Sequence, residues 1–209
     1  MKIYFTLALT IASLFAIACN QQDHTYAANK VADSTLLSNV FKTRALNLCK
    51  NAAAYAKSHA MNEQYFFFAD LSAHSGLKRF VVVDMQQQKV ITAGLVAHGA
   101  GGPYFADTAR FSNVPNSYCS SVGRYKVGEK YPGRFGSAYK LYGLDKTNDK
   151  AYDRSVVLHA YDCVTDVTIY PAYTCNSLGC PMVSYTFLKT LSGYIDKSRK
   201  PILLWIVGK

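Results

Sequence analysis

The segment from Ser177 to Pro181 reads Ser-Leu-Gly-Cys-Pro, and His159 lies upstream of it at the end of an apolar run. Cysteine and histidine can act as nucleophile and general base, because the thiolate is the reactive form of a thiol and an imidazole can take its proton and return it. Pro181 suits the first position of a helix, and apolar residues recur at helical spacing from Val183 to Ile195. We therefore expect Cys180 at the N-terminus of a helix, where free N–H groups and the helix dipole would stabilise the thiolate.

Several groups near the thiol and the imidazole could complete a site for acyl transfer. The N–H groups of Gly179 and Cys180 could form part of an oxyanion hole, and the imidazole needs a partner that fixes its tautomer. Asp162 and the carbonyl of Ala160 are both candidates for that partner. The chain order, with histidine before cysteine, argues against papain-like peptidases, which have the opposite order. The alternative to catalysis is that Cys180 and His159 are structural residues of the core.

Two polar loops upstream are further candidates for the site. His98 and Gly99 begin a glycine-rich loop that could line a cleft, although the histidine could equally form only local hydrogen bonds. Ser120 and Ser121 precede a tight turn and could bind a peptide backbone, although such serine pairs also occur in turns that bind nothing. Both loops therefore have a functional and a structural interpretation.

The use of the six cysteines depends on the compartment of the protein. Setting Cys19 aside for a lipid and Cys180 for chemistry leaves four, which allow three pairings in an oxidising environment. We expect a disulfide between Cys163 and Cys175 because they bracket one short loop; the alternative is that some of these cysteines are buried thiols. A zinc site that combines Cys163, Cys175 and Cys180 with His159 is disfavoured because the spacing lacks a Cys-x₂-Cys pair, so we expect neither a metal nor a cofactor.

The N-terminus has the pattern of an export signal. Lys2 is followed by an apolar run that ends at Ala18, which is typical of a secretory signal over 1–18 and too short for a membrane span. Small residues directly before Cys19 are typical of a bacterial lipobox, so we expect Cys19 to be lipidated, with ordinary cleavage after Ala18 as the alternative. Residues 19–33 would then tether an exported protein to a membrane facing the periplasm, the outer membrane where the cell has one.

The elements that must position the candidate site are mainly β. Apolar residues at helical spacing predict a helix over 34–60, within an N-terminal helical segment that we place at 34–61. Short β-prone runs separated by turn residues predict a sandwich or barrel over 62–209, which the helix after Cys180 interrupts. The expected strands lie within 65–68, 80–83, 90–96, 124–127, 139–142, 155–159, 167–170 and 202–207.

The net charge of +10 at pH 7 favours anionic partners such as phospholipids or acidic cell-wall polymers. Export argues against nucleic acid as that partner. The basic residues are scattered along the chain, so a basic surface without any partner is the alternative interpretation.

These motifs, taken in their order, resemble the murein L,D-transpeptidases with a YkuD-type catalytic domain, in the branch with a Ser-x-Gly-Cys-Pro motif. The resemblance covers roughly 65–207. It rests on Arg79–Asp84, Val96–Gly99, Phe111–Asn113, Ser117 with Ser120–Gly123, Gly143–Asp145 with Asn148 and Arg154, Val157–His159 and Ser177–Pro181.

The resemblance implies a mostly β fold and a monomeric cysteine acyltransferase whose donor and acceptor are peptidoglycan stem peptides. Cys180 would attack the carbonyl before the terminal D-residue of a stem tetrapeptide, with His159 as the base, and an amine of a neighbouring stem would resolve the thioester into a 3–3 cross-link. If water resolved it, the protein would be an L,D-carboxypeptidase; a non-catalytic peptidoglycan-binding lipoprotein is the remaining alternative. Ser177 would brace the cysteine turn. Further motif residues that could bind substrate are His98, Gly99, Asn113, Ser120, Ser121 and Arg154.

Overall fold

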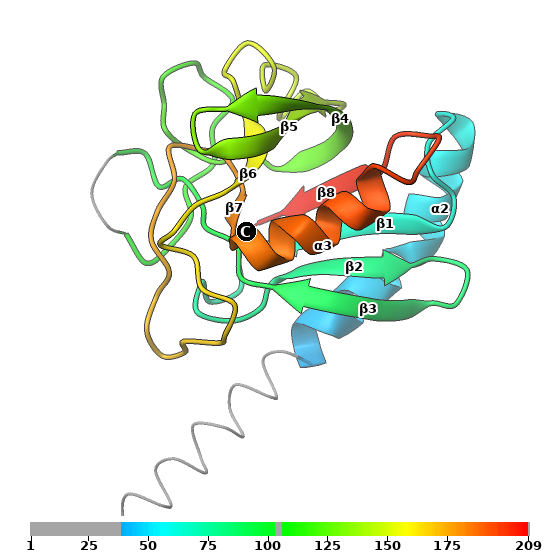
Figure 1. The fold of residues 1–209 in the computed structure, drawn as a ribbon, viewed down its shortest axis with the longest axis horizontal. Helices are drawn as coiled ribbons and strands as arrows, with labels where there is room; N and C mark the ends of the chain where they lie inside the picture. The colour runs from blue at the N-terminus through cyan, green and yellow to red at the C-terminus, as the bar shows by residue number, and fades with distance from the viewer. Residues whose placement is uncertain (1–38, 103–105, 209) are drawn as a thin grey trace, which may run out of the picture. The chain divides into compact units, whose positions relative to one another are not determined.

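One mixed β-sheet forms the centre of the fold (Figure 1). The computed structural model describes residues 39–102 and 106–208. Eight strands follow one another in the order β3-β2-β1-β8-β4-β5-β6-β7, with parallel pairing of β1 with β8 and of β6 with β7 and antiparallel pairing elsewhere. Their bounds are β1 Tyr65–Asp70, β2 Phe80–Asp84, β3 Lys89–Gly94, β4 Gly123–Gly133, β5 Gly136–Gly143, β6 Val157–Ala160, β7 Met182–Val183 and β8 Leu203–Val207.

The expected mainly β fold with two helical regions is confirmed, but one expected strand is absent. The run Val167–Tyr170 forms no strand; Ile169 and Tyr170 donate isolated hydrogen bonds to the carbonyl of Gly76. Val167 is 65% exposed, so the β propensity of this run is not supported there by burial against a neighbouring strand.

The N-terminal helix belongs to the same compact unit as the sheet, which spans Leu37–Lys209. Residues 39–47 are helical and lead through Leu48, which keeps a right-handed helical backbone, into α2 (Cys49–Ser58). The expected single helix over 34–60 therefore has an interruption at Leu48, and its first residues lie outside the described part. A second core joins this helix to the sheet and contains Phe41, Ala45, Ala52, Ala56, Phe66, Phe68, Val81, Val83 and Leu203.

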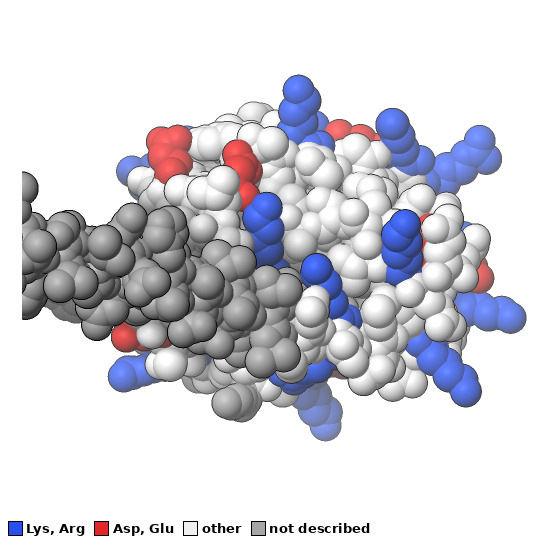
Figure 2. Space-filling model, turned by 90° about the horizontal axis from the view of Figure 1, so that it is seen from below, with Lys and Arg blue, Asp and Glu red and all other residues white. Residues whose placement is uncertain are grey.

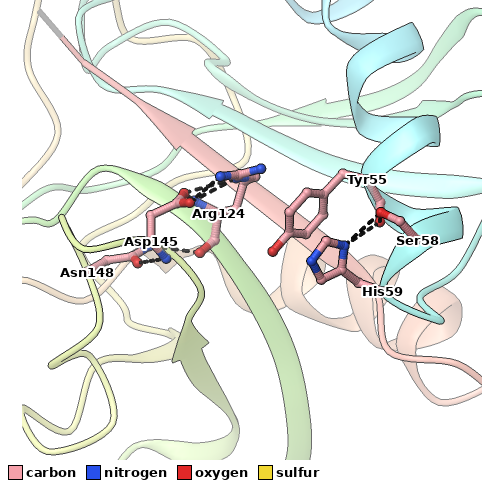
Figure 3. A network of polar contacts seen from close by, with 6 residues as sticks. All are labelled: Tyr55, Ser58, His59, Arg124, Asp145 and Asn148. Carbon is pink, nitrogen blue, oxygen red and sulfur yellow. Dashed lines mark hydrogen bonds and ion pairs between the residues drawn. The ribbon is translucent and has the colours of Figure 1, made fainter.

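An arginine on β4 fixes α2 to the sheet (Figure 3). The guanidinium of Arg124 pairs with the Asp145 carboxylate and lies over the ring of Tyr55 from α2, 4.2 Å from its centroid. Asn148 closes the turn, because its Nδ2 donates to the Arg124 carbonyl at 2.8 Å and its Oδ1 accepts from the Asp145 N–H at 2.9 Å. The motif residues Asp145 and Asn148 therefore stabilise the fold rather than contact a ligand.

Helix α3 (Tyr185–Ile195) lies against the face of the sheet where the two halves of the sheet meet (Figure 1). Its buried residues Phe187, Leu188 and Leu191 pack in one core with residues of β1 and β2 and of β4, β5 and β6. The N-cap is Ser184, whose hydroxyl accepts the N–H of Phe187 at 3.1 Å. The expectation that Cys180 lies at the N-terminus of this helix is wrong, because the intervening Met182–Val183 pairs with β6 as an extended strand.

Basic side chains outnumber acidic ones on the face of the molecule in Figure 2. Lysine and arginine side chains are distributed over the face in Figure 2, with few acidic side chains among them. Within the described ranges, no helix has the length and apolarity that crossing a membrane requires. The expected signal over 1–18, Cys19 and the tether over 19–33 lie outside the described residues.

Candidate active site

The thiol of Cys180 is free and half-buried, and backbone groups at the start of β6 hold it. The Val157 N–H donates to Sγ at 3.5 Å, and the thiol donates to the Ser155 carbonyl at 3.7 Å. Ser155 has φ of 54°, in the left-handed region that residues other than glycine rarely adopt. Such local strain is typical of functional sites, and here it lies directly beside the candidate nucleophile.

The environment of Cys180 keeps its thiol neutral. Burial raises the pKa of Cys180, and the N–H of Val157 and the charge of Arg154, which act in the opposite direction, do not compensate. The expectation of a thiol ionised by a helix N-terminus is therefore wrong, since the nearest helix begins only at Tyr185. Attack by this sulfur requires that a base removes its proton during the reaction.

The imidazole of His159 is arranged as that base. Its Nδ1 lies 3.0 Å from the carbonyl oxygen of Ala160. Because a carbonyl only accepts hydrogen bonds, Nδ1 carries the proton and Nε2 is left with a free lone pair. Burial lowers the pKa of His159, so the ring is neutral at neutral pH. Of the two candidates for the orienting group, the structure provides Ala160, and Asp162 is exposed.

The parallel pairing of β6 with β7 brings His159, on β6, close to Cys180, which directly precedes β7. His159 is the partner of Met182, and extending this parallel register by two residues places Cys180 beside Val157, in agreement with the hydrogen bond between them. Among the described residues, no hydrogen bond joins Sγ to the imidazole. Catalytic hydrogen bonds are often long in free enzymes and form only when substrate is bound, so this separation is compatible with acid–base catalysis.

The turn before Cys180 is held by its own motif residues. Ser177 Oγ accepts the N–H of Gly179 at 3.1 Å, as expected for a residue that braces the turn. The N–H of Gly179 is therefore occupied, and the expectation that it contributes to an oxyanion hole is wrong for this arrangement. The N–H of Cys180 has no partner among the described residues and remains available to an oxyanion.

The loop that begins at His98 packs against the cysteine turn and holds it by hydrogen bonds. The Ser177 N–H donates to the carbonyl of His98 at 2.8 Å, and Ser120 Oγ accepts the N–H of Gly99 at 2.9 Å. A Cβ on Gly99 would lie 2.6 Å from the amide nitrogen of Gly179, so the close approach of the two loops requires glycine. Gly99 and Ser120 therefore position the cysteine turn.

The side chain of His98 is fully buried and does not line a cleft. Nη2 of Arg79 lies 2.7 Å from Nδ1 of this ring, and since arginine only donates, Nδ1 is the acceptor. Burial and the charge of Arg79 lower the pKa of His98 to about 4. Of the two interpretations of this histidine, the structure supports the one with local hydrogen bonds only.

The other polar motif residues also bond within the protein. Arg154 donates from Nη2 to the Cys119 carbonyl at 2.7 Å and from Nη1 to the hydroxyl of Ser121. Asn113 is half-buried, and its Nδ2 donates to the Asp149 carboxylate at 2.7 Å, which ties two turns together. The structure therefore uses Arg154, Ser121 and Asn113 as braces around the site, in hydrogen bonds that leave them few free groups for a substrate.

A pocket of about 300 Å³ lies beside Cys180, because two of its lining residues are the ones that contact Sγ. Sequence reasoning placed Lys140 and residues 155–157 of this lining in predicted strands but did not predict that they meet in one pocket, and it missed Tyr131 and Tyr152. The lining residues are Tyr131, Lys140, Tyr152, Ser155, Val156 and Val157. A larger pocket of about 680 Å³, near His74 and Tyr173, includes neither Cys180 nor His159 in its lining.

A disulfide joins Cys163 and Cys175, as expected from their spacing. It closes the loop that leads from β6 to the cysteine turn. Because both sulfurs are in the disulfide, neither is available as a zinc ligand. Cys49 and Cys119 are buried free thiols, which was the alternative interpretation for part of the set.

The family of the chain follows from a match to a family model described as the L,D-transpeptidase catalytic domain, which covers residues 34–204. The chain belongs to this family. The match includes the N-terminal helix together with the sheet, in agreement with the shared core. No curated protein matches the chain.

Solved structures also match the chain, among them L,D-transpeptidases. A structure titled as the Ldtfm–avibactam carbamoyl enzyme is 14% identical, with a TM-score of 0.42 over 71% of this chain and 50% of that chain. The helical cell shape determining protein Pgp2 from Campylobacter jejuni is 11% identical, with a TM-score of 0.42 over 69% and 48%. An L,D-transpeptidase from Mycobacterium smegmatis is 13% identical, with a TM-score of 0.39 over 69% and 58%. The chain thus spans about half the length of the first two of these proteins.

Proposed function

We propose that this protein is a cysteine acyltransferase that forms 3–3 cross-links between peptidoglycan stem tetrapeptides by L,D-transpeptidation. The observation that carries the proposal is the pairing of a free thiol at Cys180 with the imidazole of His159, whose Nδ1 is fixed by the Ala160 carbonyl. Membership in the L,D-transpeptidase catalytic domain family supports the substrate class.

In the first half of the reaction, Sγ of Cys180 attacks the carbonyl carbon between the diamino acid and the terminal D-residue of the donor. Nε2 of His159 takes the thiol proton, and the N–H of Cys180 stabilises the oxyanion. The C–N bond then breaks, the leaving amine receives the proton from His159, and a thioester remains.

In the second half, an amine of a neighbouring stem attacks the thioester. His159 takes a proton from that amine and returns it to the departing sulfur, so the thiol is regenerated and a new amide joins the two stems. Water in place of the amine gives a tripeptide, and the protein would then act as an L,D-carboxypeptidase. The same residues serve both outcomes, so the acceptor decides between them.

We place the reaction outside the cytoplasm. The disulfide between Cys163 and Cys175 supports an oxidising compartment such as the periplasm. We propose that Cys19 carries the lipid that anchors the protein in a membrane and that residues 19–33 form the tether. Mass analysis of the protein isolated from its membranes would test this, and an unmodified N-terminus at Cys19 would contradict it.

The experiment that tests the activity is incubation of the purified protein with tetrapeptide muropeptides, followed by mass analysis. A dimer that has lost one terminal D-residue supports transpeptidation, and a tripeptide supports the carboxypeptidase alternative. The Cys180→Ala variant should give neither product while it keeps its melting temperature. If the wild type gives no product either, the proposed activity is wrong and a peptidoglycan-binding lipoprotein becomes the better interpretation.

A further inference from the structure

We propose that Lys140 determines the donor specificity of this site by binding a carboxylate at the end of the side chain of the third stem residue, whose carbonyl Cys180 attacks. The inference rests on the proposed function and adds to it the chemical class of that residue. It predicts a preference for a diamino acid with a second carboxylate, such as diaminopimelate, over lysine.

The position of Lys140 follows from the register of the sheet. Lys140 on β5 is the partner of Val157 on β6, and the N–H of Val157 contacts Sγ of Cys180. Paired residues place their side chains on the same face, and side chains alternate along each strand. Lys140 and His159 therefore share one face, while Tyr139 and Leu158, which alternate with them, are fully buried on the other.

Lys140 is the one charged side chain in the lining of the pocket beside Cys180. Adjacent strands lie about 4.8 Å apart, so the lysine begins one strand away from the segment that holds the thiol. A substrate side chain of several carbons that starts at the attacked carbonyl could span this distance. The pocket volume of about 300 Å³ is large enough for a side chain of this kind.

The ammonium of Lys140 is held in place before any ligand binds. Nζ lies 3.1 Å from Oε1 of Glu129 and 5.2 Å from the ring centroid of Tyr152. The hydroxyl of Tyr142 donates to the same carboxylate at 2.8 Å, and its ring stacks on that of Tyr152. An ordered ammonium loses less conformational entropy on binding than a free one does.

A carboxylate ligand can join this ion pair without breaking it. An ammonium group has three donors, so the contact with Glu129 leaves donors free for a second carboxylate, and water screens the charge of Glu129, which is more than half exposed. A lysine side chain at the same place would bring a second ammonium toward Lys140, which is unfavourable. Because Lys140 lines the pocket and Glu129 does not, the pocket favours a donor side chain that ends in a carboxylate over one that ends in an ammonium.

The test compares two tetrapeptides that differ only at the third residue, which is diaminopimelate in one and lysine in the other. The release of the terminal D-residue is measured for the wild type, Lys140→Gln and Lys140→Arg, with Lys126→Gln as a matched control. Lys126 lies on the same hairpin, over the ring of Tyr142, but it does not line the pocket.

We expect the wild type to favour the diaminopimelate peptide. In Lys140→Gln, kcat/KM for that peptide should fall tenfold or more, mostly through KM, as is typical for loss of a hydrogen bond between charged groups, and the preference should disappear. Lys140→Arg should keep most of the preference, and Lys126→Gln should keep all of it. An unchanged preference in Lys140→Gln would overturn the inference but leave the proposed function intact.

A second measurement decides the inference if neither peptide is turned over. Peptide that occupies the pocket should slow the alkylation of Cys180 by iodoacetamide. Stronger protection by the diaminopimelate peptide, lost in Lys140→Gln, would support the inference, and equal protection by both peptides would refute it. The alkylation rate without peptide also shows whether each variant keeps an intact site.

Discussion

The raised pKa of Cys180 leads to a prediction about its reactivity in the free protein. Burial is the main cause of this shift, and no hydrogen bond within the described residues links the thiol to His159. The thiol should therefore react with iodoacetamide at neutral pH more slowly than free cysteine, whose pKa is about 8.5. Each unit by which the pKa is raised lowers the thiolate fraction at neutral pH about tenfold, and the alkylation rate falls by the same factor.

The variant His159→Gln separates this arrangement from a thiolate–imidazolium ion pair. Without an ion pair, His159 contributes little to the thiolate population, so alkylation should change less than about threefold. The acyl-transfer rate should fall by about 10²- to 10⁴-fold, since the general base is lost. The contrast between the two effects is the signature of a base that acts only during the reaction.

The assay measures alkylation of the native protein from pH 6 to 10 and assigns the modified cysteine by mass analysis of its peptides. The rate at Cys180 should rise steadily with pH, without a plateau near neutrality, and Cys180→Ser should lose this modification. A fast rate below pH 7 that depends on His159 would refute the reasoning, because it would require a thiolate stabilised by an imidazolium.

Three further predictions follow from residues around the site. Replacing both Cys163 and Cys175 with serine should lower the free energy of unfolding by about 2–4 kcal/mol, because a short loop is no longer closed. A denaturant titration measures this change. If a reductant lowers the stability of the wild type by the same amount, the lost disulfide is the cause. Gly99→Ala should reduce acyl transfer at least tenfold because its Cβ collides with Gly179 and shifts the cysteine turn, whereas Gly102, where a Cβ meets nothing within 4 Å, should accept alanine with unchanged activity. The low pKa of His98, about 4 in the folded protein, means that the unfolded chain binds a proton first as the pH falls, so stability should be complete above about pH 6.5 and decrease by about 3 kcal/mol toward pH 4. A His98→Gln variant should lose this part of the pH dependence, and an unchanged slope would contradict the assignment.

The sequence permitted prediction of those features that depend on local pattern. The order of His159 and Cys180, the short disulfide loop and most strands follow from residue types and spacing within short windows. The Ala160 carbonyl was available as a partner of His159 because the two residues are adjacent. The bracing role of Ser177 follows from the same proximity, since its partner is Gly179.

Features that depend on distant partners could not be predicted in this way. The helix was placed too early because the pairing of Met182 with His159 outweighs the helical pattern that starts nearby. Arg154 and Ser121 looked like substrate-binding residues because their partners, including the carbonyl of Cys119, lie far away in the sequence. Lys140 went unnoticed because only the register of β5 and β6 places it beside the candidate nucleophile.

The position of β8 has a consequence for how the chain acquires its structure. This strand follows the other described strands in the sequence, yet it lies between β1 and β4 and is the only link between the two halves of the described sheet. Until residues 203–207 arrive, β1–β3 and β4–β7 can pair only within their own group, because no other described strand connects the two groups. In a chain still emerging from a ribosome or passing through a translocation channel, the two halves of the sheet therefore stay unjoined until residues 203–207 have been delivered.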